Sequence, residues 1–164
     1  MKWLASIVLS GTVLSLFAAI TAVAIGWTYL GTKAKIDYQV RRAEARQLLE
    51  IFPPDTHDNE IVDDVIEIAA ETALLGIRER RLGYRVRQGD TVVGVILPAT
   101  ARDGYSGDIR ALVGVRRDGS VAGVRVVAHR ETPGLGDKVD LRKSKWVLDF
   151  NGRSLTKPAL SGWN

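Results

Sequence analysis

The chain has 164 residues, which is enough for one domain of ordinary size with an additional segment. It contains no cysteine, so disulfides, thiolate nucleophiles and cysteine-held metal clusters are excluded for these residues. The net charge of +4 is compatible with a nucleic acid, a membrane surface or an acidic protein as partner. Composition alone does not decide among these partners.

The first segment narrows the choice, because residues 3–32 contain no charged side chain. A helix needs about 20 apolar residues to cross a bilayer core, and this run is longer than that. Trp3 lies near one end and Trp27 near the other, where interfacial aromatics are expected. A cleaved signal peptide is the alternative, with Ala22-Val23-Ala24 as its cleavage site, but its apolar region is usually only about 7–15 residues. We therefore predict an uncleaved membrane anchor over residues 1–32.

Two properties of the anchor bear on its neighbours. Small residues recur four apart at Ala18, Ala22 and Gly26, which predicts a flat face for packing against another membrane helix. Lys2 alone precedes the span, whereas several basic residues follow it between 33 and 46. Taken by itself, this charge bias predicts that the rest of the chain lies in the cytoplasm.

Residues 33–54 are predicted to form a charged helical connector that ends at Pro53-Pro54. Residues 61–77 fit helical spacing over part of their length and strand alternation over another part, so both structures remain open. His57 with Asp55 and Asp58 invites a metal site, but three such residues crowded in a loop are more typical of a turn. We expect no metal site and no catalytic residue set.

Residues 55–164 are predicted to form a β-rich domain, which makes the chain an α+β protein with one transmembrane helix. Asp118-Gly119 has the composition of a hairpin turn between two of its strands. Gly94, Gly114 and Gly123 lie inside strands, which indicates a flat ligand or a closely packed neighbour. The expected strands are rich in β-branched residues and cover residues 84–87, 91–97, 109–117 and 120–129.

Two glycine-rich loops flank the predicted hairpin, at 102–109 before it and 129–138 after it. Both are expected at the same end of the hairpin, where they frame a slot for a planar ring whose polar edge meets backbone N–H groups and hydroxyls. Ordinary turns are the alternative. The candidate ligand-binding residues are Gly104, Tyr105, Ser106, Gly107, Glu131, Thr132, Pro133, Gly134, Leu135 and Gly136.

Individual side chains near these loops have competing interpretations. Glu131 is expected to bond a ligand N–H, to bond a backbone amide that shapes the loop, or to cap the following turn. Trp146 is predicted to close the core, and stacking on the ring of the ligand is the alternative. The arginines at 78, 80, 81, 85 and 87 lack interleaved aromatic residues for stacking bases, so we predict a solvated face and no nucleic-acid partner.

The strings "DGYSGDI" and "HRETPGLGDK", with Trp146 and "FNG" at 150–152, resemble the G subunit of the Rnf electron-transport complex. The resemblance covers nearly the whole chain, including the membrane helix and the "PPDTHDNE" segment at 53–60. The C subunit of the sodium-pumping NADH:quinone reductase is similar to that family and shares its FMN-binding domain.

This resemblance implies a single-pass flavoprotein of the bacterial inner membrane whose soluble domain lies in the periplasm, contrary to the charge bias. It implies partnership with other membrane and redox subunits and with the lipid bilayer. It also implies an electron relay between ferredoxin and NAD in a complex that translocates Na⁺ or H⁺. Within this sequence, the flavin-pocket candidates are residues 104–107 and 131–136.

One motif of the family has no match in these residues. The resemblance implies FMN joined through its phosphate to a threonine in an S/T-G-A-T string, and no such string occurs here. We expect that threonine beyond Asn164, in a longer chain whose FMN-binding domain is only partial here. The alternative hypothesis is a cofactor-free assembly subunit of a membrane redox complex.

Overall fold

A computed structural model describes the backbone of residues 2–157, with the side chain of Trp3 and those from Ile7 onward. The chain divides into two compact units that meet between Arg42 and Ala43. One helix, α1, covers Lys2–Ile51. The predicted divisions at 32/33 and 54/55 stay predictions, because α1 runs through residue 33 without a break.

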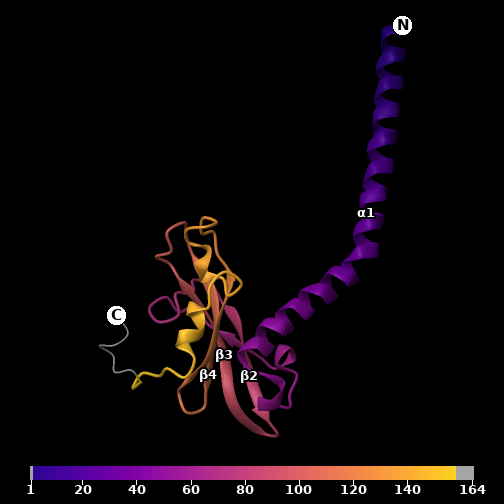
Figure 1. Cartoon of the computed structure of the whole chain (residues 1–164). Helices are drawn as coiled ribbons and strands as arrows, with labels where there is room; N and C mark the ends of the chain where they lie inside the picture. The colour runs from indigo at the N-terminus through magenta and orange to yellow at the C-terminus, as the bar shows by residue number, and fades with distance from the viewer. Residues whose placement is uncertain (1, 158–164) are drawn as a thin grey trace. The chain divides into compact units, whose positions relative to one another are not determined.

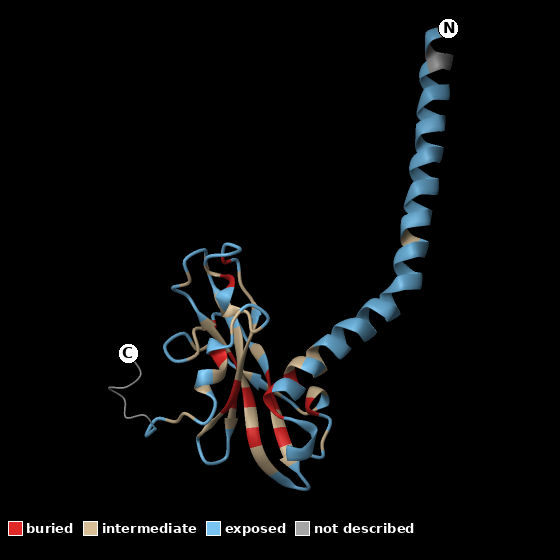
Figure 2. Cartoon of the chain, in the orientation of Figure 1, coloured by how far each residue is buried: buried red, intermediate tan, exposed pale blue. Residues whose placement is uncertain are grey.

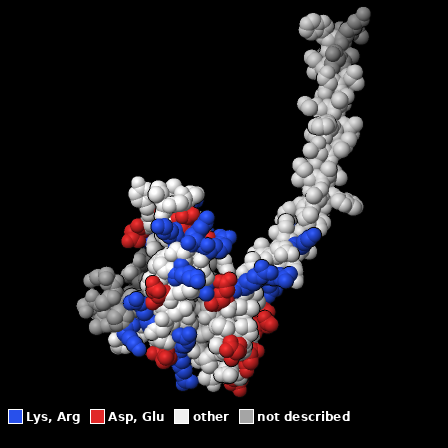
Figure 3. All heavy atoms as spheres, in the orientation of Figure 1, with Lys and Arg blue, Asp and Glu red and all other residues white. Residues whose placement is uncertain are grey.

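The first unit consists of α1 up to Arg42. The part of α1 from Ile7 on contains a stretch long and apolar enough to cross a membrane. Its large apolar side chains are exposed, and Figure 3 shows no charged side chain along most of this part of the helix. Nothing lies within 4 Å of the space above Gly26, so the predicted small-residue face is open there.

The second unit contains an antiparallel sheet of five strands in the order β1-β2-β3-β4-β5 (Figure 1). Consecutive strands are neighbours, so every connection is a hairpin or a loop at one end of the sheet. The Asp118-Gly119 turn is confirmed, because Gly119 has φ +80° between β4 and β5. The strands cover Val65–Ile68, Arg81–Gln88, Thr91–Ala101, Ile109–Arg116 and Val121–Ala128 in that order.

The four strands predicted from the β-branched runs are therefore present, with ends shifted by a few residues. The segment 61–77, for which helix and strand were both open, contains the short 3-10 helix Ile61–Asp63 and strand β1. Its remainder is a loop centred on Glu71, whose carboxyl accepts hydrogen bonds from the backbone N–H groups of Ala73, Leu74 and Leu75.

The core lies where the end of α1 packs on one face of the sheet. Leu48, Ile51 and Phe52 are buried there against Val86 and Ile96, and Figure 2 shows the buried bands on the strands and at the helix end. The Phe52 N–H makes the last helical bond, to Leu48 at 2.9 Å. The two prolines that follow have no N–H and end the helix as predicted.

The strand glycines mark a closely packed neighbour, and that neighbour is the end of α1. A Cβ at Gly114 would lie 2.2 Å from Ile51 Cγ2, and one at Gly94 would lie 2.5 Å from Phe52 Cζ. A Cβ at Gly123 would make an ordinary contact at 3.5 Å from the Ile51 backbone. The missing side chains of Gly94 and Gly114 therefore leave a shallow depression in the sheet, the seat, which Ile51 and Phe52 occupy.

Short 3-10 helices cover Pro54–Thr56, Asp137–Val139 and Trp146–Phe150. The last of these, η4, packs along β5, and Val121 N–H donates to Arg153 O at 2.8 Å. The prediction for Trp146 is wrong, because its side chain is 41% exposed while Val147 is 1% exposed. In a 3-10 helix neighbouring residues point in different directions, so burying Val147 turns Trp146 outward.

Candidate functional site

The two glycine-rich loops lie at the same end of the sheet, as predicted. Ala101 at the end of β3 pairs with Ile109 at the start of β4, and Arg110 pairs with Ala128 at the end of β5. The loops that follow Ala101 and Ala128 therefore leave the sheet at the same end of the strands, and Figure 1 shows them there as the pink and orange loops.

A single buried side chain joins these loops. Glu131 is 7% exposed, and its Oε1 accepts a hydrogen bond of 3.0 Å from the backbone N–H of Ser106 in the other loop. A Cβ at Gly104 would lie 2.9 Å from Oε1, and one at Gly136 would lie 2.3 Å from Oε2. Because neither glycine has a Cβ, the Glu131 carboxyl group fits between Gly104 and Gly136.

Of the three roles that the sequence left open for Glu131, the structure shows the one in which it bonds a backbone amide and shapes a loop. Its own backbone N–H donates to Nδ1 of His129 at 3.2 Å. A nitrogen that accepts carries no proton, so this bond requires a His129 ring with its hydrogen on Nε2. His129 thus helps to place Glu131, a role that the sequence did not reveal.

The second loop closes on itself through several of its own groups. The N–H groups of Leu135 and Gly136 both donate to Thr132 O at 3.1 Å, and the Gly134 N–H donates to Asp137 Oδ1 at 2.9 Å. Gly134 has φ +81°, a backbone conformation that L side chains rarely adopt. Because these amides serve the turn, a ligand at this edge would meet mainly side chains.

Two of those side chains are large, apolar and turned to solvent. Tyr105 is 93% exposed on the first loop, and Leu135 is 76% exposed on the second. Aromatic and aliphatic groups of this kind suit the faces of a planar ring such as that of a flavin. The loops that Glu131 joins therefore carry apolar side chains of the kind that contact a flavin ring, while contacts from all ten candidate residues stay a prediction.

Several basic residues follow the glycines of the second loop, and acids of the same segment partly neutralise their charge. The basic residues are Lys138, Arg142, Lys143 and Lys145. Arg142 pairs with Asp140 at 2.5 Å, and hydrogen bonds from Arg142 lower the pKa of Asp140 to about 2. Lys143 Nζ lies 3.7 Å from Asp137 Oδ2. Beside this run is a cavity of 610 Å³ lined in part by His129, Asp140 and Arg142. The positive charges of Arg142 and Lys143 are therefore partly neutralised.

Comparison with known proteins places both loops in a recognised class of domain. A family model described as "FMN-binding domain" matches residues 104–161, which include most of the first loop and all of the second loop with Glu131. A second model, described as "RnfG N-terminal region", matches residues 1–51, which include the whole of α1. The chain thus combines the N-terminal region of one defined family with the FMN-binding domain of another.

Relatives that align with nearly the whole chain are each named as the G subunit of an ion-translocating oxidoreductase complex. The protein of Pseudomonas aeruginosa strain UCBPP-PA14 is 44% identical over 158 residues, covering 96% of this chain and 73% of the relative. That of Pseudoalteromonas atlantica is 42% identical over 154 residues, covering 94% and 71%. A Vibrio cholerae protein is 34% identical, covering 94% and 73%. The chain belongs to this family of G subunits and is a membrane redox subunit.

Proposed function

We propose that this protein holds FMN at the two loops joined by Glu131 and relays electrons between ferredoxin and NAD within an ion-translocating complex. The observation that carries the proposal is the coincidence of the FMN-binding-domain match with the pair of loops that the structure brings together. The names of the relatives support the complex and its ion translocation.

The chain's own residues would position the cofactor. Bound FMN supplies the electron transfer itself, by accepting and donating electrons. Glu131 and His129 fix the spacing of the loops, and the exposed side chains of Tyr105 and Leu135 offer apolar contacts to the ring. Covalent attachment would require the threonine motif that the resemblance implies, and that motif does not occur in these 164 residues.

Membrane vesicles test the relay. We expect vesicles from cells that lack this protein to lose nearly all ferredoxin-driven NAD reduction, together with the linked uptake of Na⁺ or H⁺. Restoring the full-length gene should return both activities. Electron transfer that continues at the normal rate without the protein would contradict the proposed relay, and normal electron transfer without ion uptake would limit its role to coupling.

We further propose that the soluble domain lies in the periplasm, with α1 as a single-pass anchor in the bacterial inner membrane. The sequence has no cysteine, so one introduced at Asp90, in the exposed turn between β2 and β3, gives a unique label. A membrane-impermeant maleimide should label Asp90→Cys in intact spheroplasts. Labelling only after the membrane is opened would place the domain in the cytoplasm, as the charge bias suggests.

A further inference from the structure

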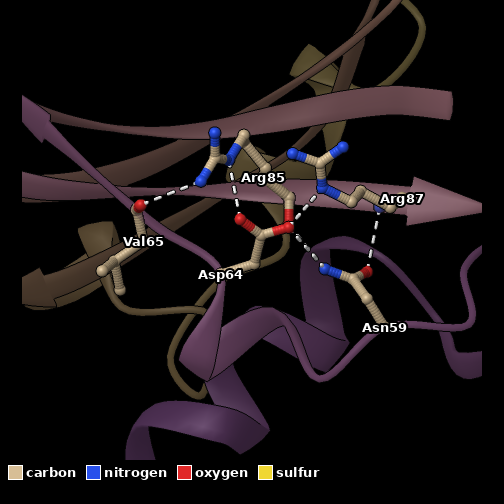
Figure 4. A network of polar contacts seen from close by, with 5 residues as sticks. All are labelled: Asn59, Asp64, Val65, Arg85 and Arg87. Atoms are coloured by element: carbon tan, nitrogen blue, oxygen red, sulfur yellow. Dashed lines mark hydrogen bonds and ion pairs between the residues drawn. The ribbon is translucent and has the colours of Figure 1, made fainter. Parts of the chain in front are cut away.

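Two arginines of β2 are held by one carboxylate. The Nε of Arg85 lies 2.7 Å from Oδ1 of Asp64, and the Nε of Arg87 lies 2.5 Å from Oδ2 (Figure 4). Asn59 also takes part in this network. Its side-chain oxygen accepts a hydrogen bond from the backbone N–H of Arg87 at 2.9 Å, and its side-chain nitrogen donates to Asp64 Oδ2 at 3.3 Å. The predicted solvated arginine face is therefore only partly exposed at these two residues, whose side chains are 38% and 30% exposed.

Asp64 fixes both guanidinium groups through their Nε atoms, and it does not occupy their remaining N–H donors. Figure 4 shows the terminal nitrogens of Arg87 pointing away from Asp64, on the side of β2 where the Arg85 guanidinium also stands. Within residues 2–157, those terminal nitrogens make no hydrogen bond, and the side chain of Arg87 is 30% exposed. Arg85 makes one further contact, a long one of 3.4 Å from Nη2 to Val65 O.

Within residues 2–157, Asp64 is the carboxylate that contacts both of these guanidinium groups. Burial raises the pKa of Asp64, but the hydrogen bonds from Arg87 and Arg85 outweigh it and leave the pKa below its usual value, so Asp64 carries a full negative charge at neutral pH. One carboxylate then faces two permanent positive charges. A single arginine would be enough to tie the segment before β1 to the sheet. The second leaves a fixed, half-buried positive charge that repels the first.

We propose that Arg85 and Arg87 form a docking site for a carboxylate side chain from another protein of the complex. The outer edge of a guanidinium group presents two parallel N–H groups that match a carboxylate, and Arg87 offers this edge already oriented. Membership in a family of complex subunits supplies protein partners. The site goes beyond the proposed flavin relay and does not depend on it.

A protein carboxylate suits this site better than a lipid surface does. Anionic bilayers attract mobile clusters of several basic side chains. Here Asp64 immobilises both arginines, and the loop before β1 carries acids that would repel an extended anionic surface: Asp58, Glu60 and Asp63. A single carboxylate in contact with the free edge avoids most of that repulsion, because it approaches at one point.

Arg87→Lys separates docking from folding. A lysine at this position can still pair with Asp64, but it has no second edge to offer a partner. In solubilised complex, we expect this variant to lower the retention of the protein about tenfold at moderate salt, as loss of a charge-assisted hydrogen bond implies. The isolated protein should melt at an unchanged temperature. The matched control is Arg80→Lys, in an exposed pair with Glu67, which should leave retention unchanged.

A measurement on the unaltered protein covers the case in which Arg87→Lys fails to fold. Phenylglyoxal modifies accessible guanidinium groups, and peptide mapping locates the modified residues. Arg87 should react in the isolated protein and be protected in the intact complex, while Arg80 reacts in both. Equal reaction of Arg87 in both states would overturn the proposal. Protection by vesicles of anionic phospholipid alone would also overturn it, in favour of a lipid headgroup.

Discussion

Glu131→Ala is expected to abolish most flavin-dependent electron transfer, with a drop of about tenfold or more in the rate of the assembled complex. The substitution removes the acceptor for the Ser106 N–H and leaves an empty space between Gly104 and Gly136. Loss of this hydrogen bond removes the link that the buried carboxyl group makes between the two loops. The measurement is the rate of NAD reduction in membranes that contain equal amounts of the variant and the unaltered protein.

Glu131→Gln is the matched control for this experiment. Glutamine has the same shape, and its side-chain oxygen can still accept from Ser106 while the charge is lost. If Glu131 acts by positioning the loops, Glu131→Gln should retain most of the activity that Glu131→Ala loses. Equal loss in both variants would show that the carboxylate itself acts on the cofactor, and full activity in both would remove Glu131 from the site.

Gly114→Ala is expected to destabilise the second unit by about 1–3 kcal/mol, the usual effect of overpacking a core. The new methyl group would lie 2.2 Å from Ile51 Cγ2, so the end of α1 has to move away from the sheet. Thermal unfolding of the full chain in mild detergent, followed by near-UV circular dichroism, measures the change. Ile51→Leu removes the clashing Cγ2 and should restore part of the lost stability.

Gly123→Ala provides the comparison, because Gly123 pairs with Gly114 on the neighbouring strand and faces the same residue of α1. Its added Cβ would lie at an ordinary 3.5 Å from Ile51, so we expect a change of less than about 1 kcal/mol. Equal destabilisation by both substitutions would mean that strand geometry, and not the seat for Ile51, requires these glycines.

The sequence predicted the elements whose signals are local. The uncharged run, the two prolines after Phe52 and the β-branched strands all act through neighbouring residues, and the structure contains each corresponding element. The Asp118-Gly119 turn belongs to the same group. The co-location of the two glycine loops also followed from the order of the strands, because adjacent antiparallel strands bring alternate connections to one end.

The details that the sequence did not predict depend on contacts between distant residues. Glu131 reaches Ser106 across 25 positions, and Asp64 holds Arg85 and Arg87 from 21 and 23 positions away. No periodicity or spacing marks such pairs. For His129 the available signal was its position two residues before Glu131, which allows a ring nitrogen to meet the Glu131 backbone N–H.

Trp146 shows a different kind of error. A tryptophan in a small domain is usually well buried, and composition favoured that role. In the structure, the short helix η4 buries Val147 and leaves Trp146 exposed. The Trp146 ring contacts Phe150 edge-on, with ring centroids 5.4 Å apart. Its indole N–H donates to Lys138 O at 2.7 Å, so the ring ties η4 to the preceding 3-10 helix, Asp137–Val139.

The flavin content of the native protein tests the central claim most directly. The polypeptide would be purified from its membrane, its intact mass measured, and flavin fluorescence recorded on the same band of a denaturing gel. We expect FMN bound to the native protein, with flavin fluorescence on its band and an intact mass that includes FMN. A native protein that assembles with its redox partners but carries no flavin would contradict the relay and favour an assembly role.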